Sequence, residues 1–325
     1  MGGACRCWKR GALIVLSLGV PSGERQRALA IFHAAVQQRA MRSGKSRPWR
    51  THRMLGVAFA LVATVLAILA WRDTTRDPIV RRTQVTLAGL DPGDAPIKIA
   101  LISDIHVAGP DMPPERLKQV VEQINALSPD IVLIAGDLIG DRYVTSSHYS
   151  PEQAVAPLGD LAAPLGVFVV PGNHDHSTNL PALASAMRRH GLRLLVNDAA
   201  QAGPLVIGGL DDAHTGRADI PETLMRMAPF SGGRVILSHS PDAFPLIPSD
   251  VGLTLAGHTH CGQIGWPWGG APLTMSRYGQ RYACGRVNES GKVLVTTAGL
   301  GTSGLPVRLF APPDIWLIKA RPPSP

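Results

Sequence analysis

Five short apolar runs in this chain each end in side chains that commonly bind metal ions. The runs cover residues 99–102, 131–135, 167–170, 235–237 and 253–256. The side chains that follow them are, in order, Asp104 and His106, then Asp137, then Asn173 with His174 and Asp175, then His239, and finally His258 with His260. Taken singly, each has a structural explanation, such as a turn or a satisfied polar group. Their recurrence at five run ends favours one shared site.

The chemistry of this set is that of a site for divalent cations. The candidate metal ligands are Asp104, His106, Asp137, Asn173, His239, His258 and His260. They offer carboxylate, amide and imidazole groups without a thiolate, which suits Mn, Fe, Zn or Mg. Seven ligands exceed the needs of one ion and suit two ions about 3.5–4 Å apart that share a carboxylate. Such a pair can polarise a phosphoryl group and generate hydroxide from water near neutral pH.

The two histidines of the segment Gly257-His258-Thr259-His260 follow an apolar run directly. If the extended backbone continues through them, both imidazoles point to the same side, because side chains along a strand alternate with period two. Gly257 would let the backbone approach neighbouring groups closely. This pair suits a metal site, although a surface His-X-His without a function is the alternative.

Alternating strands and helices are expected to position these residues. From residue 97 onward, short apolar runs alternate with helical patterns, as in an α/β domain. The predicted helices are Pro113–Leu127, Pro151–Leu161, Leu180–His190 and Pro221–Met227, and a possible strand covers Gln84–Leu87. Near-continuous apolar runs suit strands that are buried on both faces. In α/β folds the loops beyond the carboxyl ends of such strands form the ligand crevice, so the five run ends could converge there.

A membrane anchor is predicted near the N-terminus. Met54–Trp71 is a stretch of eighteen uncharged residues, long enough for a short membrane span of about 17–25 residues. A buried globular helix and a cleaved signal peptide are the alternatives. Six basic residues precede the stretch and four follow it: Arg39, Arg42, Lys45, Arg47, Arg50 and Arg53, then Arg72, Arg76, Arg81 and Arg82. The excess favours a cytoplasmic N-terminus and places the rest of the chain on the outer (periplasmic or extracytoplasmic) side.

Charge and cysteine content make some classes of protein less suitable for this chain. Residues 1–82 contain fifteen of the 32 Lys and Arg but only three of the 24 Asp and Glu, so the net charge of +8 belongs to the N-terminal arm. The larger part is mildly acidic, which disfavours nucleic-acid binding because phosphate contacts need clustered cations. The four cysteines, Cys5, Cys7, Cys261 and Cys284, form no zinc-type pair and do not suggest a disulfide framework.

The ordered motifs resemble those of the calcineurin-like metallophosphoesterases. The motifs are Asp104-x-His106, Gly136-Asp137, Gly172-Asn173-His174-Asp175, His239 and Gly257-His258-x-His260. The set is specific in its order, although each motif alone is weak. Ser276-Arg277-Tyr278-Gly279 and Gly299–Gly304 resemble the bacterial membrane-associated branch of that family, which includes lipid-active phosphodiesterases.

The resemblance implies a fold and a division of the ligands. The fold is a four-layer α/β sandwich of two mixed β-sheets flanked by helices, here preceded by one transmembrane helix. One metal would be held by Asp104, His106, Asp137 and His260, and the other by Asp137, Asn173, His239 and His258. His174 would assist the leaving oxygen, and Asp175 would orient His174. Composition and the resemblance together predict a basic, disordered arm (1–53), the anchor (54–71), a linker with a first strand (72–96) and a metallophosphoesterase domain (97–325).

The expected function is hydrolysis of a phosphoester, mono- or diester, by attack of a metal-bound hydroxide. The anchor makes a phospholipid or another lipid-linked phosphoester a candidate substrate, beside a soluble phosphodiester. The alternatives are a metal-binding scaffold module at the membrane and a metal-dependent amidohydrolase.

Several further residues carry weaker expectations. Cys261 is expected to be a small packed residue, with an extra-ligand or redox role as the alternative. His176 and His214 are expected near the ligands or at the surface. The aromatic segment Trp266–Gly270 could contact an acyl chain or the membrane, with a plain packing role as the alternative. Arg308 could contact the substrate phosphate.

Overall fold

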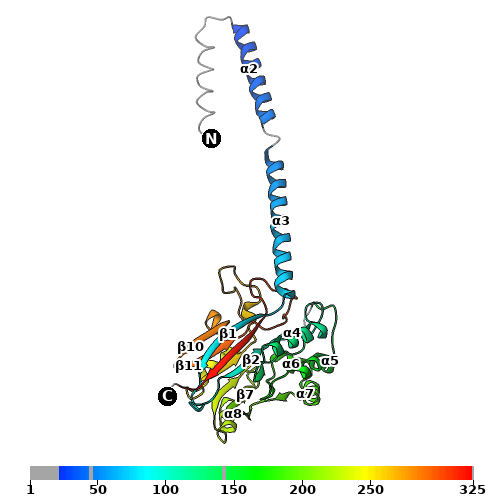
Figure 1. The fold of residues 1–325 in the computed structure, drawn as a ribbon. Helices are drawn as coiled ribbons and strands as arrows, with labels where there is room; N and C mark the ends of the chain where they lie inside the picture. The colour runs from blue at the N-terminus through cyan, green and yellow to red at the C-terminus, as the bar shows by residue number, and fades with distance from the viewer. Residues whose placement is uncertain (1–21, 44–46, 141–143, 324–325) are drawn as a thin grey trace. The chain divides into compact units, whose positions relative to one another are not determined.

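Two six-stranded mixed sheets make up the centre of the domain that follows Leu66 in the computed structural model (Figure 1). The structure describes residues 22–43, 47–140 and 144–323. The first sheet, in spatial order, consists of β1 (Ile79–Thr86), β12 (Asp314–Arg321), β2 (Ile97–Ile102), β3 (Ile131–Ile134), β4 (Val167–Val169) and β5 (Arg193–Leu194). The second consists of β10 (Gly285–Glu289), β11 (Lys292–Thr296), β9 (Leu253–Ala256), β8 (Gly233–Leu237), β7 (Leu205–Gly209) and β6 (Asp198–Ala202).

Strand β2 shows why the apolar runs are continuous. Ile99 and Leu101 belong to the core between the two sheets, whereas Ala100 and Ile102 pack into the layer of helices on the other face. Because successive side chains point to opposite faces, a strand covered on both sides needs an apolar residue at every position. β2 pairs with β3, and β3 with β4, in parallel, so their carboxyl ends lie at one edge of the sheet.

Helices cover the outer faces of both sheets and complete four layers. The helical segments of the domain are α4 (Pro114–Ala126), α5 (Pro151–Val155), η1 (Ala156–Asp160), α6 (Asn173–Thr178), α7 (Leu180–Arg189), α8 (Ile220–Met227), η2 (Pro241–Leu246), η3 (His260–Gly262) and η4 (Gly279–Arg281). The apolar faces of α4, α5 and α7 pack on the first sheet, and α8 packs on the second. The four predicted helices are present, and the predicted α/β sandwich is confirmed.

The two ends of the domain pair with each other, which the sequence pattern did not indicate. β12 lies between β1, to which it is parallel, and β2, to which it is antiparallel. β1 begins at Ile79, five residues before the expected strand at Gln84–Leu87. Arg321 is the last residue of β12 and pairs with Thr86. Local sequence does not indicate these bounds, because each strand gains its hydrogen bonds from a partner more than 200 residues away.

The N-terminal unit, which runs to Val65, is helical where the structure describes it. α2 (Ser22–Ser43) corrects the expectation of a disordered arm over residues 22–43, since this stretch is rich in the helix formers Ala, Gln and Arg. Residues 1–21 lie outside the described part. α3 (Arg47–Thr75) extends beyond the predicted span. Its segment His52–Thr75 contains an 18-residue window with a mean hydropathy of 2.4, and only 6% of that window is buried. By length and composition, α3 is therefore able to cross a membrane.

Candidate metal centre

The backbone at the strand ends adopts conformations that non-glycine residues rarely adopt. Asp104, His106, Asp137, His258 and His260 all have φ between 47° and 68°. Each such residue costs roughly 1 kcal/mol or more and persists only where its surroundings hold it in place. The extended backbone expected through His258 and His260 is therefore wrong: β9 ends at Ala256, and η3 begins at His260. The strained turns re-aim these side chains toward one point.

Asp104 is held so that one of its oxygens faces the site. Its Oδ2 accepts hydrogen bonds from Ser103 Oγ at 2.5 Å and from the His258 amide at 2.8 Å. A Cβ at Gly257 would lie 1.8 Å from Ser103 Oγ, so only glycine allows this close approach. The other oxygen, Oδ1, is buried and has no hydrogen-bond partner among the described residues. A buried carboxylate oxygen without a donor is a ready ligand for a cation.

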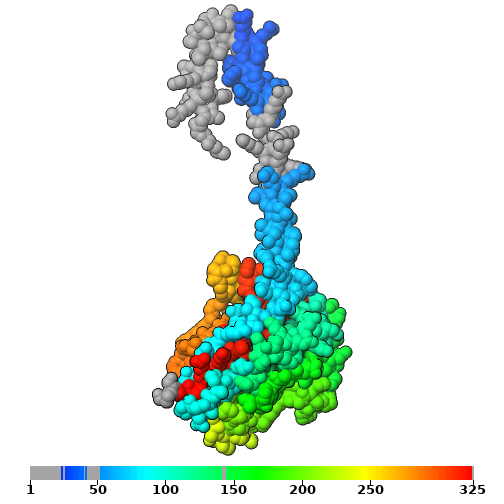
Figure 2. All heavy atoms as spheres, viewed as in Figure 1, coloured from blue at the N-terminus to red at the C-terminus, as the bar shows by residue number. Residues whose placement is uncertain are grey.

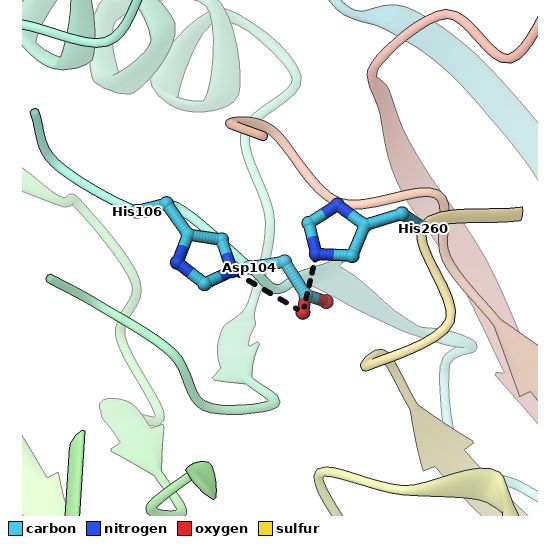
Figure 3. A group of neighbouring side chains, drawn as sticks. All are labelled: Asp104, His106 and His260. Carbon is cyan, nitrogen blue, oxygen red and sulfur yellow. Dashed lines mark ion pairs between the residues drawn. The ribbon is translucent and has the colours of Figure 1, made fainter. Parts of the chain in front are cut away.

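Two imidazoles flank that oxygen in one half of the site (Figure 3). Asp104 Oδ1 lies 3.3 Å from His260 Nε2 and 3.9 Å from His106 Nε2. The ligand atoms of Asp104, His106 and His260 all lie within 4.8 Å of one another, and all three residues are buried. The spacing leaves room for an ion between the side chains, and the donor set fits a borderline or hard divalent ion.

The other half of the site is built around His239. Its Nε2 lies 3.1 Å from Asp137 Oδ2 and 3.2 Å from both Asn173 Oδ1 and His258 Nδ1. Its Nδ1 lies 2.7 Å from the Ala135 carbonyl oxygen; donation of the Nδ1 proton there leaves Nε2 as the metal-binding nitrogen of a neutral ring. The structure thus brings together all seven predicted ligands.

Asp137 lies between the two halves. Its Oδ2 is 3.1 Å from His239 Nε2 and 3.6 Å from His106 Nε2. Its Oδ1 accepts a hydrogen bond from the His174 amide at 2.9 Å. A carboxylate that faces imidazoles of both halves has the position that a bridging ligand would need.

The buried carboxylates of the cluster require a neighbouring positive charge. Burial raises the pKa of Asp104 to about 6, although His239 opposes the change. Burial alone would lower the pKa of His239, but Asp137 raises it to about 10. Burial and His239 lower the pKa of His258 to about 3, so that ring is neutral. A proton on His239 and a metal ion are therefore alternative ways to balance the carboxylates.

His174 lies at the rim of the cluster. It is only partly buried, and its ring packs edge-on against the ring of His106, with 4.9 Å between the centroids. Its Nε2 lies 3.4 Å from Ser303 Oγ. This position, beside the ligands and open to solvent, suits a group that meets a substrate.

Asp175 has contacts that differ from the expected one. We expected it to orient His174, but its described hydrogen bonds come from three backbone amides, those of Asp137, Leu138 and Gly172, at 2.8–3.0 Å. Burial and Asp137 raise the pKa of Asp175 to about 6, despite these donors. The carboxylate thus joins the loop after β3 to the loop after β4 and holds Asp137 in its strained conformation.

Arg308 does not reach the substrate side. It is fully buried, and its guanidinium donates to the carbonyl oxygens of Ala298, Gly301 and Ala311 at 2.5–2.9 Å. Its Nη2 lies 3.2 Å from Nδ1 of His260, behind the imidazole. The expectation of a phosphate contact is therefore wrong, because three backbone carbonyls occupy its donors. Arg308 supports the His260 ring instead.

Two further histidines, His176 and His214, lie beside the site. His176 Nε2 is 2.6 Å from Asp211 Oδ1 at the loop after β7. The ring of His214 lies 4.4 Å from that of His258 and is exposed. His214 borders the half of the site that contains His239. The sequence predicted that both histidines lie near the ligands or at the surface, but it did not predict these contacts.

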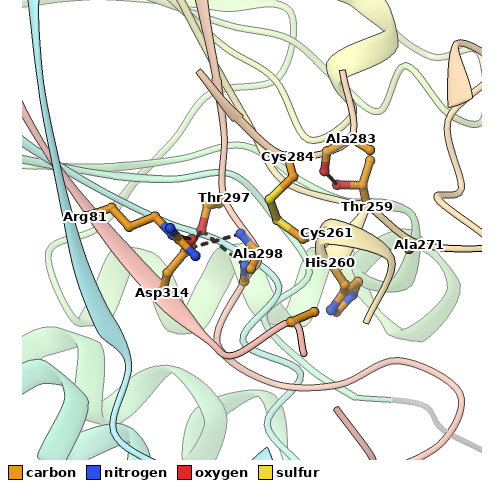
Figure 4. The surroundings of a disulfide bond; sticks show 12 residues. Arg81, Thr259, His260, Cys261, Ala271, Ala283, Cys284, Thr297, Ala298 and Asp314 are labelled. Atoms are coloured by element: carbon orange, nitrogen blue, oxygen red, sulfur yellow. Dashed lines mark hydrogen bonds and ion pairs between the residues drawn. A yellow bond between two sulfur atoms is a disulfide. The ribbon is translucent and has the colours of Figure 1, made fainter. Parts of the chain in front are cut away.

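A disulfide bond joins the metal loop to a distant segment (Figure 4). Cys261, next to His260, is bonded to Cys284. Thr259 Oγ1 also donates to the Ala283 carbonyl oxygen at 2.6 Å, so two adjacent links hold the loop. The expectation that Cys261 is simply a packed residue therefore needs correction, although one bond does not make a disulfide framework. The 23-residue separation carries no local pattern that would have indicated the pairing.

Comparisons with known proteins agree with this geometry. The family model described as calcineurin-like phosphoesterase matches residues 97–262. The metallophosphoesterase YkuE of Bacillus subtilis is 36% identical over 237 residues, covering 69% of this chain and 79% of its own. A zebrafish (Danio rerio) transmembrane protein with a metallophosphoesterase domain is 28% identical, covering 78% of this chain.

Some relatives are considerably longer than this chain. The match spans 60% of the zebrafish protein and 58% of a Caenorhabditis elegans metallophosphoesterase that is 29% identical over 83% of this chain. Among solved structures, a Thermus thermophilus 5'-nucleotidase precursor has a TM-score of 0.42 at 13% identity, over 63% of this chain and 49% of its own. The family model and the identity to YkuE decide the classification: the chain belongs to the calcineurin-like phosphoesterases, which are metal-dependent phosphoester hydrolases.

Proposed function

We propose that this chain hydrolyses a phosphoester at a centre that holds two divalent ions. The supporting observation is that the three groups of potential ligands overlap: Asp104-His106-His260, His106-Asp137-His174 and Asp104-Asp137-His239. Asp104, His106 and Asp137 each belong to two of them, which joins the groups into one cluster. One ion would be held by Asp104, His106, Asp137 and His260, and the other by Asp137, Asn173, His239 and His258. Mn, Fe, Zn and Mg all suit these ligands.

The residues divide the work of the reaction. When bound, the ions would polarise the phosphoryl oxygens and lower the pKa of a water molecule. Asp104 and His239 are held in position by Ser103, the His258 amide and the Ala135 carbonyl. His174, at the rim, donates a proton to the leaving oxygen as its bond to phosphorus breaks.

The membrane helix and the disulfide support a location and a class of substrate. α3 makes a phospholipid or another lipid-linked phosphoester the first candidate substrate, and a soluble phosphodiester the second. Disulfides persist in oxidising compartments, so Cys261–Cys284 favours the outer side of the membrane, as does the six-to-four excess of basic residues before the span. A C-terminal alkaline phosphatase fusion should be active. If the phosphatase fusion were inactive and a C-terminal green fluorescent protein fusion were fluorescent, the domain would instead lie on the cytoplasmic side.

The experiment on function uses the full chain purified in detergent. We expect about two divalent ions per chain and turnover of bis(4-nitrophenyl) phosphate or 4-nitrophenyl phosphate with added Mn. Asp137→Asn should lower both the metal content and turnover, the latter at least 100-fold, because it removes the shared charge. Asp160→Asn, at an exposed carboxylate, is the matched control. Bound metal without turnover of any phosphoester would instead favour a scaffold module.

A further inference from the structure

The exposed apolar side chains of the domain concentrate in two loops. Those of residues 263–275 and 303–310, which we call the apolar loop pair, are between 40% and 79% exposed: Ile264, Trp266, Trp268, Leu273, Met275, Leu305 and Phe310. The other large apolar side chains exposed after residue 76 are scattered over the described surface. Contiguous exposed apolar groups of this kind mark interaction sites.

Hydrogen bonds join the two loops into one surface. The Gly265 amide donates to the Leu309 carbonyl at 2.8 Å, and the Leu309 amide to that of Gln263 at 3.0 Å. The Gln263 side chain also donates to the carbonyls of Ser303 and Leu305. The rings of Trp266 and Trp268 stack, with 5.5 Å between their centroids. The apolar side chains therefore stand on a braced platform.

This surface adjoins the end of the membrane helix. Phe310 N donates to Asp73 Oδ2 at 2.9 Å, and Arg308 N donates to Thr74 Oγ1 at 2.7 Å. Asp73 and Thr74 lie in the last turn of α3, within the unit that begins at Leu66. Only residues 76–78 separate α3 from β1, a reach of roughly 10 Å. Figure 2 shows the orange and red segments of these loops projecting from the end of the domain where those turns lie.

The same loops border the metal centre. Ser303 Oγ lies 3.4 Å from His174 Nε2, and Arg308 contacts the ring of His260. Whatever contacts the apolar loop pair therefore lies beside the rim at which His174 meets the substrate.

The composition of the surface favours lipid over a protein partner. Tryptophan and tyrosine concentrate at membrane interfaces, where an apolar ring and a polar edge are both satisfied. Arg277, Arg281 and the partly exposed ring of Tyr278 flank the loops. The two arginines pair with Asp242 and Glu289, but their side chains are 67% and 59% exposed, and cations suit anionic headgroups. A domain joined to a spanning helix by three residues must present this end to the bilayer.

We propose that the apolar loop pair inserts into the interfacial layer of the membrane that holds α3, so that the metal centre acts on phosphoesters presented at the bilayer surface. The insertion rests on the membrane anchor of the proposed function, and action at the bilayer surface also rests on its hydrolytic activity. The expected depth is that of interfacial aromatic residues, at the level of the headgroups and first acyl carbons.

Quenching of tryptophan emission tests the insertion without reference to activity. The full chain is reconstituted into phosphatidylcholine vesicles, with or without acyl chains brominated near the headgroup. Subtracting the emission of the Trp266→Phe/Trp268→Phe variant from that of the native chain gives a difference emission that comes from these two residues. Phenylalanine keeps the surface apolar. We expect brominated vesicles to quench this difference emission at least twofold, whichever way the chain is oriented, because both leaflets contain bromine.

A matched control places a tryptophan at the far end of the domain. Met225 is exposed on α8, and α8 lies away from the end of the domain that contains the last turns of α3 (Figure 1). Met225→Trp in the double-variant background should add emission that bromine does not quench. Unquenched difference emission from the Trp266 and Trp268 pair would overturn the insertion and leave the surface to a protein partner or a second copy. Turnover of bis(4-nitrophenyl) phosphate by the same vesicles separates the two proposals: quenching without turnover keeps the insertion and removes the hydrolytic function.

Discussion

At the scale of single residues, Asp175 shows how a buried carboxylate can matter without touching a substrate. Its two oxygens accept from the amides of Asp137, Leu138 and Gly172. Those amides lie in the turns that direct Asp137 into the site, where a Cβ at Gly172 would lie only 2.1 Å from Asp137 Oδ1. The family motif alone suggested a role in orienting His174. The hydrogen bonds instead assign it to the backbone of the metal loops.

Asp175→Asn should therefore destabilise the fold. An asparagine has one acceptor oxygen, and its NH₂ group would face an amide donor, so the free energy of unfolding should fall by about 2–3 kcal/mol. Thermal unfolding followed by circular dichroism measures the loss of stability. Metal titration measures the weaker metal affinity that should accompany it. Asp160→Asn should leave both unchanged. If Asp175→Asn kept native stability and metal affinity and lowered only turnover, orientation of His174 would be the better account.

Arg308 marks a limit of residue-level prediction. A long basic side chain near a glycine-rich segment suggests a phosphate ligand when only the sequence is available. Its burial depends on three carbonyl oxygens, from Ala298, Gly301 and Ala311, which converge only in the folded chain. No local pattern encodes that convergence, whereas the metal ligands were predictable because each follows an apolar run that forms a strand.

At the scale of elements, the strand ends were predictable and their backbone was not. Runs such as 99–102 and 131–134 form β2 and β3 because burial on both faces demands continuous apolar sequence. The left-handed turns after them depend on contacts with other loops, and so does the 3-10 turn that begins at His260. Sequence periodicity therefore located the site but gave the wrong backbone conformation for its histidine pair.

The disulfide adds a testable constraint on the η3 loop. Closing a loop of 23 residues stabilises a fold by about 3 kcal/mol in the chain-entropy description. Because Cys261 adjoins His260, reduction should lower the unfolding temperature and weaken metal binding together. Melting curves with and without a phosphine reductant measure the first effect, and metal titration the second. Cys261→Ala/Cys284→Ala should resemble the reduced protein and no longer respond to reductant; an equal response in that variant would assign the effect elsewhere.

At the scale of the whole molecule, the site depends on both sheets. Asp104 and Asp137 follow β2 and β3 of the first sheet, whereas His239 and His258 follow β8 and β9 of the second. Ions held between them would link the two sheets at one edge of the core, in addition to any chemistry they perform. The layered fold was predictable from alternating strands and helices together with the family resemblance. The placement of β12 between β1 and β2 was not, because it joins residues at opposite ends of the domain.

Metal removal should therefore destabilise the domain, and more strongly at pH 8 than at pH 6. An ion at about 100 times its dissociation constant adds about 2.7 kcal/mol, which for a domain of this size corresponds to roughly 5–10 °C in unfolding temperature. Asp137 raises the pKa of His239 to about 10 in the metal-free protein, so a proton competes with the ion for that ring below pH 10. Apparent metal affinity then rises with pH, and so does the loss of stability caused by chelation.

Melting curves with EDTA and with added Mn at both pH values measure this difference. Asp137→Asn should respond little to EDTA or to Mn. A chelator effect that is equal at the two pH values, or larger at pH 6, would mean that His239 does not exchange its proton for the ion.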